Sequence, residues 1–172
     1  DAVMLSNETA VGDFPVEAVQ TMATIARRIE KDYPQRSIDS HLPSTIPNAL
    51  SGAVSTIASQ LNASAILPLT RSGATARNVS KFRPAAPILA ITPDRTVACR
   101  LQLVWCVTPL VIPEGERTTQ TFQAAMVKAK ELNLLKEGDL VVQSAGTHAG
   151  VSGSTDLVKV SIVGNEAEAT LI

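Results

Sequence analysis

The fold is decided by the stretch Ala65-Ile66-Leu67-Pro68-Leu69-Thr70-Arg71-Ser72-Gly73-Ala74-Thr75. Residues 65–69 form a short apolar run bounded by turn residues, which predicts a buried strand. Residues 70–74 are small and polar and predict a loop. A short basic helix is predicted from Thr75 to Phe82, because Pro84 follows closely. A strand that leads through a short loop into a helix begins a βαβ unit, so this stretch predicts an α/β fold.

The alternation of strands and helices continues on both sides of this unit. Apolar runs and helical spacing predict further strands at 88–91, 107–112, 140–143 and 157–163, and further helices at 47–61, 94–103 and 118–135. Asp94 is the expected cap of its helix. The last two strands lack a helix between them, so one is expected to run antiparallel. We therefore predict a doubly wound, mostly parallel five-stranded sheet with one antiparallel strand and helices on both faces.

The beginning of the chain has a different pattern. Residues 3–5 read as a short buried strand, 6–13 as a polar turn, and Pro15 as the start of a helix. Because the chain opens on what reads as the end of a strand, we expect a piece of a larger protein. The predicted parts are an N-terminal unit (1–34), a linker (35–45), an α/β domain (46–164) and the start of a further linker or segment (165–172).

Composition excludes several classes of protein. The 172 residues are 45% hydrophobic, 18% charged and 3% aromatic, with a net charge of −1. The apolar content excludes a fully disordered chain and predicts an aliphatic core. The near-zero charge argues against a nucleic-acid groove or a polybasic membrane surface. No apolar run is long enough to predict a membrane-spanning helix.

Cysteines and histidines are too few for a disulfide framework or a multi-histidine metal site. Cys99 and Cys106 have neither disulfide nor zinc spacing, and we expect buried free thiols in a reducing compartment. The chain has two histidines, His41 and His148. No metal ligands are predicted.

The first candidate site is the loop between the 65–69 strand and the helix that follows it. Hydroxyls, backbone N–H groups and a basic side chain can all donate to a phosphate there, and a glycine lets the backbone approach closely. No P-loop lysine follows the glycine, so a nucleoside triphosphate site of that type is not supported. The alternative is an ordinary strand–helix turn. The candidate phosphate-binding residues are Thr70, Arg71, Ser72, Gly73, Ala74 and Thr75.

A second candidate is the small, donor-rich segment 146–155, which is expected at the ends of the strands, where doubly wound sheets bind ligands. Its alternative is a long surface hairpin loop. The 114–117 segment is interpreted as a solvated cap. Without paired carboxylates or a Ser/His/Asp set, the sequence predicts a binding site, not an active site. The candidate residues of this second segment are Gly146, Thr147, His148, Gly150, Ser152, Gly153, Ser154 and Thr155.

Ordered motifs along nearly the whole chain resemble the pyruvate kinase family. The stretch from Asp1 to Val19, which begins Asp1-Ala2-Val3-Met4-Leu5-Ser6-Asn7-Glu8-Thr9-Ala10, is similar to the last strand and helix of that family's TIM barrel, although the family usually has a small residue at Asn7. The stretch Thr70-Arg71-Ser72-Gly73-Ala74-Thr75-Ala76-Arg77 is similar to its effector loop. Further similar segments are 81–84, 87–93, 103–105, 128–131, 138–139, 144–146 and 153–155.

The resemblance implies a parent enzyme that transfers phosphate from phosphoenolpyruvate to ADP in glycolysis, using Mg²⁺ and usually K⁺. It implies that residues 1–34 are the last βα unit of the barrel, and that metal ligands and the catalytic lysine lie in earlier strands. Ser6 matches a serine near the family's proton-delivery site and is expected to be an auxiliary catalytic residue. We expect residues 1–172 alone to be inactive and to bind no metal. The parent enzyme is expected to be a cytoplasmic homotetramer.

The resemblance also implies that 70–75 grips one phosphate of an activator and that 146–155 closes over it. Where fructose-bisphosphate-activated relatives carry a tryptophan and an arginine, this chain has Glu114 and Thr121. These are poor partners for a second phosphate, so we expect a monophosphate such as glucose 6-phosphate, ribose 5-phosphate or AMP. Arg117 and Thr121 are the candidate residues for a second contact with the effector.

Two other functions use the same features. A free-standing phosphosugar-binding, isomerase-like module also has Ser/Thr loops on a doubly wound sheet, but it leaves residues 1–19 unexplained. A structural oligomerisation domain that binds nothing is the other alternative, and titration with a phosphate ligand separates it from a regulatory domain.

Overall fold

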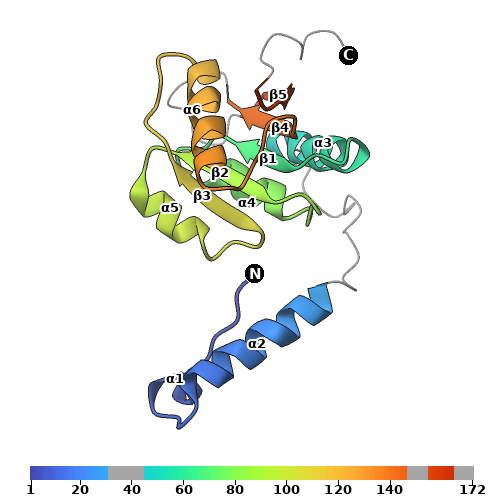
Figure 1. Cartoon of the computed structure of the whole chain (residues 1–172). Coiled ribbons are helices and arrows are strands. Elements are labelled where there is room, and N and C mark those ends of the chain that lie inside the picture. Colours follow the sequence, from blue (N-terminus) through green and yellow to red (C-terminus); the bar gives the residue numbers. More distant parts are fainter. Residues whose placement is uncertain (31–44, 147–154, 165–172) are drawn as a thin grey trace. The chain divides into compact units, whose positions relative to one another are not determined.

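The computed structural model describes residues 1–30, 45–146 and 155–164. The chain divides into two compact units, Asp1–Gln35 and Arg36–Ile172, each of which is described by itself (Figure 1). Most of the predicted linker 35–45 and the whole predicted tail 165–172 lie outside the described residues.

The N-terminal unit contains two helices, α1 (Asn7–Ala10) and α2 (Pro15–Glu30). Proline suits the first turn of a helix, and Glu17 in that turn complements the helix dipole. The predicted strand at 3–5 is wrong, because residues 1–6 have no regular secondary structure. A strand needs a neighbour for its backbone hydrogen bonds, and none of the described residues pairs with this segment.

The second unit is an α/β domain whose sheet has the strand order β3-β2-β1-β4-β5. The pairs β1–β2, β1–β4 and β2–β3 are parallel and β4–β5 is antiparallel, so the predicted fold class is confirmed. Its elements are α3 (Ile46–Gln60), β1 (Ala65–Pro68), α4 (Ala74–Ser80), β2 (Ile88–Thr92), α5 (Arg95–Leu101), β3 (Val107–Val111), α6 (Thr118–Glu131), β4 (Leu140–Ala145) and β5 (Leu157–Ile162).

Helices cover both faces of the sheet and make two aliphatic cores. Side chains alternate along β1, so Ala65 and Leu67 face one core while Ile66 faces the other. The first core contains Phe122 and Met126 of α6, and the second contains residues of α3, α4 and α5. The central strand β1 is fully buried, as its apolar sequence predicts.

The chain order places a switch point between β1 and β4. From β1 the chain adds β2 and β3 on one side, and then returns to add β4 on the other side. The loop after β1 and the segment after β4 therefore leave the same edge of the sheet as neighbours. In open α/β sheets, ligands bind outside the carboxyl ends of strands at such a point.

Three details refine the predicted elements. The Asp94 cap is confirmed, since its Oδ1 accepts a hydrogen bond from Thr96 N at 2.7 Å. Helix α6 ends at Glu131, earlier than predicted, and Asn133 follows in the left-handed region at φ +55°. Among the described residues, no helix is long and apolar enough to cross a membrane.

The prediction that both cysteines are buried is wrong. Cys99 and Cys106 are both exposed, and neither forms a disulfide bond with a described residue. Helix α5 turns Val97, Ala98 and Leu101 toward the core, so Cys99 falls on its outer face. Cys106 lies in the turn before β3, at φ +58°.

Candidate functional site

The loop after β1 is anchored to the sheet at its first residue. Thr70 N donates to Ile91 O at 2.8 Å, and the Thr70 side chain is buried. Ser72 and Arg71 are exposed at the tip of the loop, and Thr75 is buried in the first turn of α4. The first N–H groups of a helix have no intrahelical partner, so the loop combines backbone donors with side-chain hydroxyls.

Gly73 is the residue that gives the loop its shape. It caps α4 in the left-handed region at φ +80°. A Cβ at this position would lie 2.8 Å from Arg77 Nη1 and 3.1 Å from Leu101 Cδ2. Arg77 donates from Nη2 to Ser72 O at 3.0 Å, which holds the loop against the helix. The backbone conformation therefore favours glycine, and a Cβ would in addition press on these two side chains.

A buried hydrogen bond joins the two predicted ligand segments. Thr75 Oγ1 and Thr155 Oγ1 lie 2.9 Å apart, and the two threonines are 5% and 3% exposed. Thr155 stands just before β5, next to Asp156, whose N–H donates to Ala145 O of β4 at 3.1 Å. The fold thus brings the ends of the 70–75 and 146–155 segments together at the switch point.

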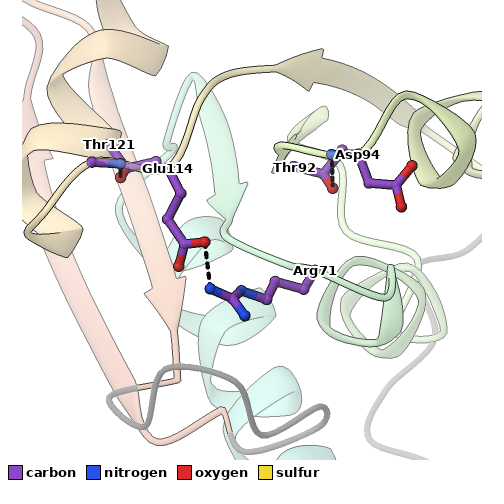
Figure 2. A network of polar contacts seen from close by, with 6 residues as sticks. Arg71, Thr92, Asp94, Glu114 and Thr121 are labelled. Carbon is purple, nitrogen blue, oxygen red and sulfur yellow. Dashed lines mark hydrogen bonds and ion pairs between the residues drawn. The ribbon is translucent and has the colours of Figure 1, made fainter.

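Arg71 forms an ion pair with Glu114 across the carboxyl ends of three strands (Figure 2). Arg71 Nη2 lies 2.5 Å from Glu114 Oε2. Glu114 follows β3, Arg71 follows β1, and the strand between them, β2, ends at Thr92, whose Oγ1 accepts from Asp94 N at 3.3 Å. The 114–117 segment, interpreted from sequence as a solvated cap, therefore contributes a carboxylate to the candidate site.

The two possible second contacts both lie at the start of α6. Thr121 is 2% exposed, and its Oγ1 accepts from Gly115 N at 3.0 Å. Arg117 is exposed, and its backbone N–H donates to Gln120 Oε1 at 3.2 Å. Both residues thus help to fix the turn that carries Glu114, and their contact with a ligand stays a prediction.

Most of the second candidate segment lies outside the described residues. Gly146 and Thr155 are described and lie at the ends of β4 and β5. The predicted residues outside the described part are Thr147, His148, Gly150, Ser152, Gly153 and Ser154.

Ser6 lies in the N-terminal unit, just before α1, and is exposed. Its backbone N–H donates to Glu8 Oε2 at 3.0 Å. Hydrogen bonds from the backbone N–H groups of Glu8 and Ser6 lower the pKa of the Glu8 carboxyl below its usual value, because they favour the charged form. The Glu8 carboxylate is thus held by the Ser6 backbone N–H, and a catalytic role for the Ser6 hydroxyl stays a prediction.

Sequence reasoning missed two polar features of the site. The Arg71–Glu114 pair joins residues 43 positions apart, which no local spacing reveals. Ser144, at the end of β4, is fully buried, and its Oγ has no hydrogen-bond partner among the described residues. Side chains two residues apart on a strand share a face of the sheet, so Ser144 could have been placed on the same face as Val142, which α3 and α4 cover.

No group of three or more His, Cys, Asp or Glu side chains that could hold a metal ion occurs in the described part of the chain. The described residues thus offer no such cluster for the Mg²⁺ that the resemblance implies for the parent enzyme.

Together these features define a class: a doubly wound α/β domain whose polar loops meet at the switch point of its sheet. The chain belongs to the pyruvate kinase family. The sequence profile of the family described as "Pyruvate kinase, alpha/beta domain" matches residues 48–161. The match covers the second unit from α3 to β5.

Curated relatives extend the similarity to the N-terminal unit. Pyruvate kinase 2 of Synechocystis sp. is 58% identical over 163 residues, which cover 95% of this chain and 28% of that protein. The pyruvate kinases of Geobacillus stearothermophilus and Clostridium acetobutylicum are 43% and 40% identical, over 28% and 35% of their lengths. The chain thus spans about a third of the length of these relatives.

Proposed function

We propose that this chain is the C-terminal regulatory part of a cytoplasmic pyruvate kinase and that its α/β domain binds a phosphorylated activator. The observation that carries the proposal is the 2.9 Å contact between Thr75 Oγ1 and Thr155 Oγ1. It supports a single site built from two segments that the sequence analysis singled out separately. A site at a switch point of the sheet is also where doubly wound domains bind ligands.

The chemistry of the 70–75 loop favours a phosphate. Thr70, Ser72 and Thr75 supply hydroxyls, the backbone around Gly73 supplies N–H groups, and Arg71 supplies a cation. A phosphate monoester presents several acceptor oxygens, which matches this set of donors. The 146–155 segment then closes over the ligand, as the resemblance to the family implies.

Regulation follows from a population shift. In a homotetramer, a ligand that binds one packing of the α/β domains better than another shifts the equilibrium toward that packing. The shift repositions the catalytic barrels, to which residues 1–34 belong. Such couplings typically amount to about 1–3 kcal/mol.

The direct test places a negative charge in the loop. Ser72→Glu and Thr75→Glu should abolish binding of glucose 6-phosphate to the chain in isothermal titration, because carboxylate and phosphate repel each other. Thr56→Glu, on the exposed face of α3, is the matched control and should bind normally. Ser72 is exposed, so its variant remains informative if Thr75→Glu unfolds. Normal binding by Ser72→Glu contradicts the site.

A free-standing, isomerase-like module that binds a phosphosugar is the second candidate function, because it would use the same Ser/Thr loop to bind its ligand. Its test is turnover of a sugar phosphate by the isolated chain, which the regulatory proposal predicts to be absent.

A further inference from the structure

The starting observation is the ion pair that connects the loops after β1 and β3 (Figure 2). Arg71 and Glu114 side chains are 54% and 42% exposed, and their charged ends point toward each other. They lie on opposite sides of β2 in the strand order, so the pair reaches across the carboxyl edge of the sheet. Arg71 is also the one arginine among the candidate phosphate-binding residues of the 70–75 loop.

The turn that carries Glu114 is held in place by backbone hydrogen bonds. Gly115 N donates to the buried Thr121 Oγ1, and Arg117 N donates to Gln120 Oε1. Gly115 packs closely, since a Cβ there would lie 3.2 Å from Gln120 Cβ. The backbone of Glu114 is therefore fixed against the first turn of α6, and its carboxylate stays within reach of Arg71.

A guanidinium uses the same N–H groups to bind a carboxylate or a phosphate. We propose that Glu114 is an internal competitor for the phosphate of the ligand, and that the ligand binds Arg71 by displacing this carboxylate. The inference rests on the proposed function, since it assumes that the 70–75 loop receives a phosphate. Glu114 then lowers the affinity of the site and favours strongly charged anions over weak ones.

The size of the effect follows from the exposure of the pair. Exposed ion pairs are weak and screened by salt, so removing the competitor should tighten phosphate binding by roughly two- to five-fold at low ionic strength. The gain should fall as salt is added, because salt screens the pair and the ligand alike.

The experiment is a nuclear magnetic resonance titration of the 172-residue chain with inorganic phosphate, following the Gly73 and Thr75 amides. Glu114→Gln should tighten binding, and Glu116→Gln should not. Glu116 lies in the same turn and makes no ion pair with a described residue, so its variant removes the same charge without freeing Arg71. In an Arg71→Met background, Glu114→Gln should give no gain.

Each other outcome overturns the inference in a recognisable way. If Arg71→Met weakens binding but Glu114→Gln does not tighten it, Glu114 is not a competitor and the proposed site stands. Equal gains from Glu114→Gln and Glu116→Gln indicate a general change of charge instead. A gain that persists in Arg71→Met shows that Glu114 does not act through Arg71. If no variant shifts the Gly73 and Thr75 amides, the proposed site and the inference both fail.

Discussion

The hydroxyls of Thr75 and Thr155 lie 2.9 Å apart, although 80 residues separate the two threonines in the sequence. Thr75 belongs to the first turn of α4, and Thr155 lies two residues before the start of β5. Both side chains are almost fully buried. This hydrogen bond therefore couples the β1–α4 loop to the antiparallel end of the sheet.

Thr155→Val should lower the free energy of unfolding by about 1–2 kcal/mol, because it leaves the buried Thr75 hydroxyl without this partner. Urea unfolding of the chain measures the loss. Thr155→Ser keeps a hydroxyl and should retain most of the stability. In a double-mutant cycle with Thr75→Val, strictly additive losses would show that the two hydroxyls do not interact.

Gly73→Ala should destabilise the domain more than Gly138→Ala. Both glycines have a positive φ, +80° and +84°, so each alanine costs about 1–2 kcal/mol of backbone strain. At Gly138 a Cβ meets nothing within 4 Å, whereas at Gly73 it approaches Arg77 and Leu101. We expect a further loss of about 1–3 kcal/mol at Gly73 from overpacking.

The same pair of variants separates the two causes in urea unfolding. Equal losses at the two positions would mean that the contacts around Gly73 adjust without cost. Phosphate binding gives a second readout, since only Gly73→Ala changes the candidate loop.

A monophosphate should bind the chain, and a second phosphate should add no affinity. The residues at the expected second-phosphate position are a carboxylate, Glu114, and a buried hydroxyl, Thr121, which already accepts a hydrogen bond from Gly115 N. Isothermal titration with glucose 6-phosphate and fructose 1,6-bisphosphate makes the comparison. Tighter binding of the bisphosphate that is lost in Arg117→Ala would contradict this prediction.

The isolated chain should not convert phosphoenolpyruvate and ADP to pyruvate and ATP. The described residues offer no metal-binding cluster, and the resemblance places the catalytic lysine in earlier strands of the barrel. A coupled assay with Mg²⁺ and K⁺ present measures turnover directly, with an active full-length pyruvate kinase as the positive control. Turnover by residues 1–172 would overturn the division between catalytic and regulatory parts.

The α/β domain could be predicted from the sequence because its local signals agree with one another. Apolar runs such as 65–69, the Asp94 cap and the absence of a helix between the last two strands each indicate the same mixed sheet. The candidate loop was predictable for the same reason, since it lies between a strand and a helix. That Thr70 and Thr75 bind a phosphate stays a prediction.

Other features depend on neighbours that a local pattern does not reveal. The apolar run at 3–5 lacks a partner strand among the described residues, so its pattern alone does not produce a strand. Cys99 is exposed because its helix turns other residues toward the core. The Arg71–Glu114 pair arises from the order of three strands, which sets two distant loops at one edge of the sheet.

The central claim is that the loop after β1 binds a phosphate monoester. Its most direct test is a nuclear magnetic resonance titration of the chain with glucose 6-phosphate, using glucose as the control. We predict saturable shifts of the amides from Thr70 to Thr75 and of Thr155 with the phosphate ester, and none with glucose. Unchanged amides at these positions in the presence of the phosphate ester would contradict the account.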